Sequence, residues 1–139
     1  MNHAQMQHIC PGSTFLKPAK LSDYSFVFDG KSTASIHTQK GAVANLIPNV
    51  GKHVWGALYN ITPDDVAALD SLEDIPITYQ KISNLSVQDS DGAMVDNVLT
   101  YLRPPQTTGR PTDEYKTTVL QGARDCDLPA DYIAELEQL

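Results

Sequence analysis

The sequence predicts an α+β fold whose core is a small curved sheet or barrel. Roughly the first hundred residues are dominated by short runs rich in β-branched and aromatic residues, separated by Gly, Pro, Asn and Asp. Segments with helical spacing of apolar residues gather near the C-terminus. No repeat, low-complexity tract or linker divides the 139 residues, so we expect a single domain over residues 1–139.

The composition is that of an acidic globular protein. Apolar residues make up 41% of the chain and charged residues 19%, so wholesale disorder is not expected. The formal net charge is −7 and the 10 Lys and Arg residues are scattered, which argues against a nucleic-acid partner because phosphate binding requires clustered positive charge. No stretch has the length of a membrane span, and no charged start precedes an apolar run as in a signal peptide, so we expect a cytoplasmic protein.

The N-terminal half is expected to contain one short helix and four strands. Met6 and Ile9, at helical spacing, predict a helix over residues 2–9, which Cys10-Pro11-Gly12 ends. The strands are expected over Thr14–Ala19, Tyr24–Phe28, Ala42–Ile47 and Val54–Ile61, with a polar loop over Lys31–Lys40. The third of these strands is expected to end at Pro48-Asn49 and Gly51.

The C-terminal half is expected to contain a hairpin and two further helices. The hairpin joins strands Tyr79–Gln88 and Ala93–Leu102 through a turn at Asp89–Gly92. Three prolines and no periodicity make Arg103–Pro111 a loop. The helices are expected over Asp113–Cys126, with Thr112 as the N-cap, and over Ala130–Leu139.

The segment after the fourth strand is the starting point for a functional hypothesis. Thr62 is a suitable N-cap, Pro63 suits the first helical position, and Asp65 completes a loose capping box with Thr62. We therefore expect a helix from about Pro63 to Glu73.

Glu73 is the candidate catalytic residue. At ~100° per residue, Val66, Leu69 and Leu72 define an apolar stripe centred near Leu69, and Glu73 falls roughly 40° from that centre. Burial and the negative end of the helix dipole both raise a carboxyl pKa, and a raised pKa suits a general base at neutral pH. The alternative, which helix geometry alone favours, is a surface glutamate at a frayed helix end.

Tyr115 is the candidate substrate-binding residue. It is expected in the first turn of the helix that follows the proline-rich loop, where its hydroxyl could reach a pocket. Tyr115, Val119, Gly122 and Cys126 share one face of that helix. On local grounds alone, an aromatic ring that packs the helix onto the sheet is the favoured interpretation.

Other chemical motifs are not supported. Gly30-Lys31-Ser32 resembles the end of a phosphate-binding loop, but Ser25 stands where that motif needs its first glycine. The four histidines lack metal-ligand spacing, and we expect exposed or capping side chains and no metal site. Cys10 and Cys126 lie far apart without C-x-x-C spacing and are interpreted as inert free thiols.

Several short motifs occur in a fixed order along nearly the whole chain. They are M-x-x-x-C-P-G-S-T-F-L at Met6–Leu16, V-W-G-A-L-Y at Val54–Tyr59, L-D-S-L-E-D at Leu69–Asp74, Tyr79, the strand ending at Tyr101, P-T-D-E-Y at Pro111–Tyr115, Q-G-A at Gln121–Ala123 and L-P-A-D-Y at Leu128–Tyr132. Each motif is weak by itself, but their order and spacing resemble those of the gamma-glutamylcyclotransferase-like family, in its small single-domain branch.

This resemblance implies a fold, a reaction and two residue roles. The fold is a small mixed β-barrel with flanking helices. The glutamate of the family's L-D-x-x-E motif is the catalytic acid/base and falls on Glu73, and the tyrosine of the P-x-x-x-Y segment helps to bind substrate and falls on Tyr115. The implied reaction is the intramolecular cyclisation of a γ-glutamyl amine or γ-glutamyl amino acid to 5-oxoproline and a free amine. It requires no metal and no organic cofactor, and its partner is a small γ-glutamyl substrate.

Two departures from the family pattern accompany the resemblance. Family members begin with a strand ending in Y-G-S-N, whose loop supplies backbone N–H groups to the substrate, whereas this chain starts at Met1-Asn2, where that motif should have finished. We expect a weak activity or none, and a gap in the sheet that a neighbouring chain could fill by strand exchange in a homodimer. The residue after the glutamate, often glycine in the family, is Asp74.

Two functions therefore compete. Glu73 and Tyr115 favour an enzyme, whereas the absent Y-G-S-N loop favours a non-catalytic module that keeps the pocket and binds a small amino-acid-like ligand. A third alternative is that the resemblance carries only the fold.

Overall fold

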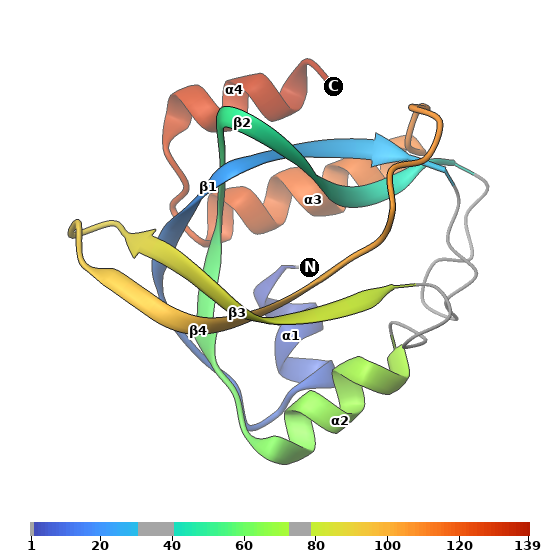
Figure 1. Ribbon diagram of the computed structural model, residues 1–139. Coiled ribbons are helices and arrows are strands. Elements are labelled where there is room, and N and C mark those ends of the chain that lie inside the picture. The colour runs from blue at the N-terminus through green and yellow to red at the C-terminus, as the bar shows by residue number, and fades with distance from the viewer. Residues whose placement is uncertain (1, 31–40, 73–78) are drawn as a thin grey trace.

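The computed structural model describes residues 2–30, 41–72 and 79–139, which form a four-stranded antiparallel sheet and four helices (Figure 1). The α+β class predicted from the sequence is confirmed. The predicted loop over Lys31–Lys40 lies outside the described residues. In chain order the elements are α1 (His3–Ile9), β1 (Thr14–Asp29), β2 (Val43–Asn60), α2 (Pro63–Leu72), β3 (Gln80–Asp89), β4 (Met94–Leu102), α3 (Asp113–Asp125) and α4 (Ala130–Glu137).

The two longest strands correct the sequence prediction, because each replaces two expected short strands. β1 and β2 pair antiparallel along their whole length, from Thr14 opposite Asn60 to Asp29 opposite Val43. The prediction that the chain turns at Pro48-Asn49 and Gly51 is wrong, since those residues lie within β2. Four residues, 49–52, are accommodated there as an irregularity between the pairs Ser22–His53 and Tyr24–Pro48.

The backbone at this irregularity explains why the strand continues. Pro48 lies on a strand at the edge of the sheet, where its missing N–H is not needed for a second ladder. Gly51 has a φ of 85°, which a bulge readily requires, and its N–H donates to Asp23 Oδ1 at 3.0 Å. The sequence therefore marks a bulge at this position and not the end of a strand.

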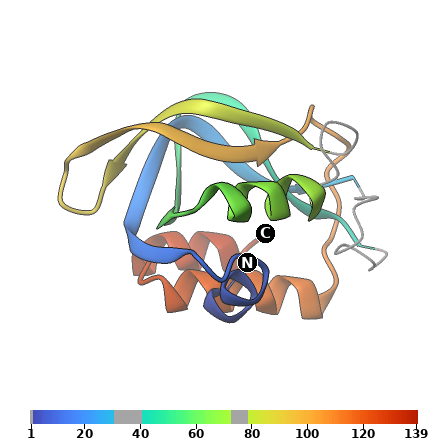
Figure 2. The same cartoon turned by 90° about the horizontal axis from the view of Figure 1, so that it is seen from below.

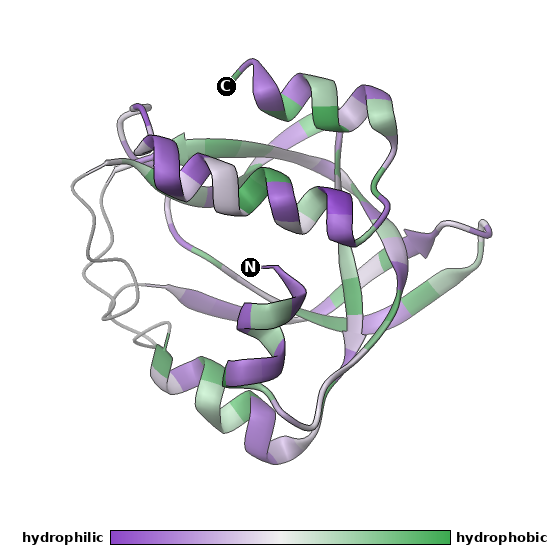
Figure 3. Ribbon diagram, turned by 180° about the vertical axis from the view of Figure 1, so that it is seen from behind, coloured by the Kyte–Doolittle hydropathy of each residue, from purple (hydrophilic) through white to green (hydrophobic). Residues whose placement is uncertain are grey.

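The helices cover the sheet in two groups (Figures 1 and 2). α3 and α4 pack on β2 through a cluster of buried residues made by Val54, Ala123, Tyr132 and Leu136. α1 and α2 meet in a second cluster, made by Met6, Cys10 and Leu69. Hydrophilic and hydrophobic residues alternate along α3, as expected for a helix that buries one stripe (Figure 3).

The sheet has the order β2-β1-β3-β4 and remains open in the described part of the chain. β3 joins β1 only through the pairs Ala19–Asp89 and Lys20–Gln88, and it forms the predicted hairpin with β4. No ladder joins β2 to β4 among the described residues, and a cavity of about 410 Å³ is lined by residues 57–60 of β2, by Ile61 and by residues 95–101 of β4. The closed barrel implied by the family resemblance is therefore not seen between these two strands.

Candidate active site

A cavity of about 600 Å³ is lined by the sheet and by α3 and α4. This volume falls within the range of about 300–1,000 Å³ that small-molecule sites usually occupy. Four tyrosines contribute to its wall: Tyr79, Tyr101 and Tyr115, from three different parts of the chain, and Tyr132 of α4. The cavity is therefore the candidate active site.

The predicted face of α3 points to this cavity. Tyr115, Val119, Gly122 and Cys126 all line it. The helix begins as predicted, because Thr112 is its N-cap and its Oγ1 accepts a hydrogen bond from the Tyr115 N–H at 3.2 Å. The regular spacing of the stripe means that the cavity follows α3 from its first turn to its last.

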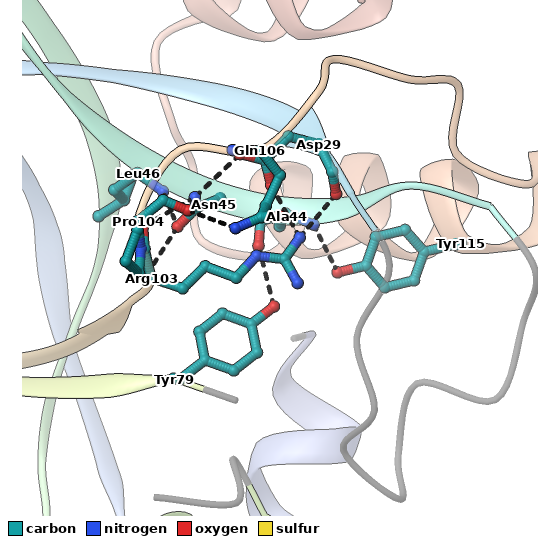
Figure 4. A network of polar contacts seen from close by, with 9 residues as sticks. All are labelled: Asp29, Ala44, Asn45, Leu46, Tyr79, Arg103, Pro104, Gln106 and Tyr115. Carbon is teal, nitrogen blue, oxygen red and sulfur yellow. Dashed lines mark hydrogen bonds and ion pairs between the residues drawn. The ribbon is translucent and has the colours of Figure 1, made fainter. Parts of the chain in front are cut away.

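Two of the tyrosines are held by one backbone position of β2, Ala44 (Figure 4). The Ala44 N–H donates to the Tyr115 hydroxyl at 3.1 Å, and the Tyr79 hydroxyl donates to the Ala44 carbonyl at 3.2 Å. The Tyr115 ring also meets the buried Phe28 edge-on, with ring centroids 6.1 Å apart. The Tyr115 ring therefore packs the helix on the sheet, and the residue also lines the cavity; its role in substrate binding stays a prediction.

A buried ion pair, Asp29 with Arg103, lies against the Tyr79 ring. Arg103 Nη2 donates to Asp29 Oδ1 at 2.7 Å and to the Asp29 carbonyl at 2.6 Å, and its guanidinium lies 5.4 Å from the centre of the Tyr79 ring. Asn45 Nδ2 and the Gln106 N–H each donate to Asp29 Oδ2 at 3.0 Å. Burial raises the pKa of Asp29, but these donors outweigh it and hold the pKa below its ordinary value.

A second set of polar contacts ties the third tyrosine to the last turn of α2. The Tyr101 hydroxyl donates to Asp70 Oδ1 at 2.6 Å, and Lys81 Nζ lies 2.8 Å from Asp70 Oδ2. The hydrogen bond from Lys81, followed by that from Tyr101, lowers the pKa of Asp70. The carboxyl end of α2 is thereby fastened to β3 and β4 beside the cavity.

Glu73, the candidate catalytic residue, lies outside the residues that the structure describes, as does Asp74. The helix that leads to Glu73 agrees with the prediction: it begins at Pro63, and Thr62 and Asp65 exchange the two hydrogen bonds of a capping box, at 3.0 and 3.2 Å. Leu69, the predicted centre of the apolar stripe, is buried. The inward orientation of Glu73 stays a prediction.

One histidine differs from the expectation of exposed or capping side chains. His8 and His53 are exposed, but His3 is half-buried, with Nδ1 2.6 Å from the Tyr59 hydroxyl and Nε2 3.0 Å from the Asp125 carbonyl. The His3 ring also contacts the Phe15 ring edge-on, with ring centroids 5.0 Å apart. No local pattern predicts these contacts, which join the N-terminal helix to the C-terminal end of α3.

Both thiols are free, as interpreted from the sequence, and the structure also places both in buried positions. Burial is the main cause that raises the pKa of both Cys10 and Cys126. Cys126 also lines the cavity, with Sγ 3.9 Å from His3 Nε2. A raised thiol pKa lowers the fraction of thiolate at neutral pH, so it gives no support to a cysteine nucleophile.

Sequence reasoning missed Tyr79, Tyr101 and Arg103 as parts of the site. The two tyrosines belonged to the motifs of the family resemblance but were given no role, and Arg103 was placed at the start of a loop. Arg103 is in fact buried, with 5% of its surface exposed. In the sequence, Arg103 is a single arginine directly after a predicted strand, and such an arginine does not by itself indicate a buried ion pair.

Within the described ranges, no group of three or more His, Cys, Asp or Glu side chains is arranged to hold a metal ion. No described helix is both long and apolar enough to cross a membrane.

Comparisons with known proteins relate most of the chain to one family. Residues 53–136 match the AIG2-like family. A human protein named gamma-glutamylcyclotransferase is 22% identical over 129 residues, which cover 93% of this chain and 68% of that protein. The mouse protein of the same name is 24% identical over 132 residues, with the same two shares.

Solved structures show the same fold. A structure described as gamma-glutamyl cyclotransferase superimposes with a TM-score of 0.87 at 22% identity, over 99% of this chain and 81% of that one. YkqA from Bacillus subtilis superimposes with a TM-score of 0.79 at 21% identity, over 97% of this chain and 46% of that one. At these identities the structural likeness concerns the fold alone.

Proposed function

The chain belongs to the AIG2-like family, and from that premise we propose that residues 1–139 form a single gamma-glutamylcyclotransferase-like domain that converts a γ-glutamyl amine or γ-glutamyl amino acid to 5-oxoproline. The observation that carries the proposal is the tyrosine-lined cavity of about 600 Å³ beside the carboxyl end of α2. The names of the human and mouse relatives supply the reaction class.

The proposed reaction exchanges one carbon–nitrogen bond for another within the substrate. Glu73 takes a proton from the α-ammonium group, and the freed amine attacks the γ-carbonyl carbon to form a five-membered ring. The bond from that carbon to the amide nitrogen then breaks, Glu73 gives its proton to the departing amine, and the ring nitrogen releases its second proton to that amine or to water. Because attack is intramolecular, the main task of the protein is to hold the glutamyl chain folded.

The base needs a pKa closer to that of the group it deprotonates. A free α-ammonium has a pKa of about 7.7–8.0 and a free glutamic acid about 4.3. Asp70, whose pKa is lowered by Lys81 and Tyr101, lies three residues before Glu73 in the sequence, and on the predicted continuation of the helix its negative charge disfavours a second anion. The end of the helix dipole acts in the same direction. These causes support Glu73 as a base with a raised pKa.

Tyr115 is proposed to form part of the substrate-binding wall. Its hydroxyl is fixed by the Ala44 N–H, so it can present a defined polar atom to a bound γ-glutamyl group without a loss of side-chain freedom on binding. Tyr79, whose hydroxyl donates to the Ala44 carbonyl, is proposed to form the same part of the wall as Tyr115.

The first prediction concerns Glu73. Glu73→Gln should lower kcat by about 10²–10⁴-fold, the usual contribution of a general acid–base group, with little change in the thermal unfolding midpoint. The measurement is release of 5-oxoproline from several γ-glutamyl amides. Asp74→Asn is the matched control, since it removes the neighbouring negative charge and should keep most of the activity.

Full activity of Glu73→Gln would exclude Glu73 as the base. A non-catalytic module would instead bind γ-glutamyl amides in calorimetry while releasing no 5-oxoproline from any of them. The two functions are therefore separated by measuring binding and product on the same samples.

A homodimer formed by strand exchange remains part of the proposal. It is supported by two sheet edges, those of β2 and β4, that are unpaired in the described part of the chain and that line one cavity of about 410 Å³. Light scattering at several protein concentrations tests it, and a strictly monomeric chain with the same activity would contradict it.

A further inference from the structure

The outer edge of β2 carries backbone groups that no other described strand takes up. β2 lies at one end of the sheet, so its N–H and C=O groups that face away from β1 have no ladder partner in the described part of the chain. At Ala44, the N–H donates to the Tyr115 hydroxyl and the C=O accepts from the Tyr79 hydroxyl. This edge of β2 therefore already provides polar backbone groups to the wall of the larger cavity.

Ala57, further along β2, presents a second pair of such groups. The Ser90 N–H donates to the Pro18 carbonyl at 3.0 Å, so the carbonyl of Pro18 faces the side of β1 on which β3 lies. Pro18 lies directly opposite Ala57, and residues opposite one another in an antiparallel pair exchange either both of their backbone bonds or neither. The N–H and C=O of Ala57 consequently face away from β1, and no described residue bonds to them.

Ala57 lies where three cavities meet. It lines the cavities of about 600 Å³ and 410 Å³ and a third cavity of about 120 Å³. Tyr101 also lines both of the larger cavities, and its hydroxyl bonds to Asp70 near the carboxyl end of α2. The Ala57 N–H is therefore close to the end of the helix on whose continuation Glu73 is expected.

Gly56, directly before this N–H, has no evident reason within the fold to lack a side chain. Its φ is not positive, and its pairing with Ala19 continues to the next pair without a bulge. A Cβ at this position would have no described heavy atom within 4 Å other than those of its chain neighbours. A glycine in a strand that is needed for neither backbone conformation nor packing is typical of a place that a ligand or another backbone approaches closely. Because Gly56 also lines the larger cavity, a molecule bound there can approach the Ala57 N–H.

We propose that the Ala57 N–H donates a hydrogen bond to the γ-carbonyl oxygen of the substrate, and that Gly56 leaves the room for this contact. The proposal rests on the proposed cyclisation and assigns to it a donor for the charge that develops. When the α-amine attacks, the γ-carbonyl oxygen becomes an oxyanion, and a fixed backbone N–H stabilises the oxyanion more than it stabilises the neutral carbonyl. The bonds that form and break in the cyclisation are unchanged.

Ala57→Pro removes this donor and leaves the ladder with β1 intact. The Ala57 N–H faces away from β1, so its loss breaks no bond of the sheet. β2 already carries a proline in this orientation, since Pro48 lies an even number of residues from Ala44 with no register shift between them. The proposal predicts that kcat for release of 5-oxoproline from γ-glutamylalanine falls by about 10²-fold or more, as for other single oxyanion donors. The thermal unfolding midpoint should change little.

Val50→Pro is the matched control. It also adds a proline to β2, but Val50 is 90% exposed and lines none of the three cavities. Its kcat and KM should equal those of the wild-type chain. Wild-type kcat and KM in Ala57→Pro would overturn the proposal.

Gly56→Val tests the room beside the donor and decides the question if Ala57→Pro fails to fold. Valine favours strands, so the thermal unfolding midpoint should not fall. Its side chain would enter the space beside the Ala57 N–H and should lower kcat/KM by about tenfold or more. A lower midpoint with unchanged kcat/KM would show that packing requires the glycine, and would overturn the proposal.

The outcomes separate this proposal from the reaction on which it rests. Turnover by the wild-type chain that neither variant lowers contradicts the proposal and leaves the cyclisation standing. If the wild-type chain releases no 5-oxoproline, calorimetry with γ-glutamylalanine decides: weaker binding by Ala57→Pro than by Val50→Pro sustains the contact, and equal or absent binding overturns it. If light scattering shows that Ala57→Pro changes the oligomeric state while its kinetics do not change, the N–H belongs to strand exchange and the proposal is overturned.

Discussion

Two acid–base pairs, Asp29 with Arg103 and Asp70 with Lys81, join the same kinds of charge in different surroundings. The first is buried, with 5% of the Arg103 side chain and 2% of the Asp29 side chain exposed. The second lies near the surface, with 33% of Lys81 and 31% of Asp70 exposed. Each pair stands beside one cavity tyrosine, Tyr79 or Tyr101.

The two pairs differ in the free energy that the loss of one partner should cost. A buried charge that loses its partner keeps the full cost of its removal from water, whereas a surface charge is solvated again. The Asp29 pair joins the last residue of β1 to the residue that follows β4, and we expect the loss of one partner to be costly. The Asp70 pair adds little to stability, and its importance lies in fixing Tyr101 and the carboxyl end of α2 beside the cavity.

The largest expected effect is the loss of the buried guanidinium. Arg103→Ala should lower the free energy of unfolding by about 3–5 kcal/mol, because it leaves the Asp29 carboxylate buried with too few donors. Lys81→Ala is the matched change in the exposed pair and should cost only about 0–1 kcal/mol. Urea unfolding of both variants measures the contrast, and equal losses would show that burial does not distinguish the pairs.

A double variant tests whether Asp29 and Arg103 stabilise the protein as a pair. Asp29→Asn combined with Arg103→Met should be less destabilised than the sum of the single changes, because no charge is then left buried alone. Strict additivity would mean that the two side chains do not act as a pair.

The second effect depends on pH. The folded pKa of Asp29 is depressed, so its contribution to stability is complete above the unfolded value of about 3.9 and is lost as the pH falls through the folded value. The wild-type chain should therefore lose stability more steeply than Asp29→Asn when the pH is lowered from 5 to 3.

The readout is the difference between the two urea midpoints at each pH. Asp65 and Asp70 also have lowered pKa values and contribute equally to both proteins, so they cancel in this difference. A difference that stays constant between pH 5 and 3 would contradict the role given to Asp29.

The smallest expected effect concerns the exposed pair. Tyr101→Phe removes one hydrogen bond to Asp70 and should cost about 0.5–1.5 kcal/mol of stability. If that bond positions the end of α2, kcat for 5-oxoproline release should fall by about tenfold, equivalent to about 1.4 kcal/mol. Tyr24→Phe is the control, since Tyr24 packs on the core and does not line the cavity. Unchanged kcat in Tyr101→Phe would limit the Asp70 contacts to a structural role.

Local chemistry made much of the fold predictable. The capping box of Thr62 and Asp65, the N-cap Thr112 and the Asp89–Gly92 turn all occur where the sequence placed them. Each depends on residues within four positions of one another, so a short window contains the whole interaction. The prediction failed at Pro48 and Gly51, because the same residues suit a turn and a bulge, and the pairing partner decides between them.

The candidate site was predictable in part. The stripe on α3 follows from helical periodicity alone, and it does line the cavity. By contrast, Asp29 and Arg103 are 74 residues apart in sequence, and Tyr115 reaches Ala44 across 71 residues. No local pattern specifies such contacts.

The sequence by itself determined the positions of the helices, the hairpin of β3 and β4, the caps of α2 and α3, and the face of α3 that carries Tyr115. These depend on backbone preferences and on spacing, which act between near neighbours. Only the tertiary structure decided which polar groups meet: Arg103 with Asp29, Tyr101 with Asp70, and two tyrosines at one residue of β2. Those pairings depend on the register and curvature of the sheet, which bring distant residues together and which are set by the packing of the whole chain.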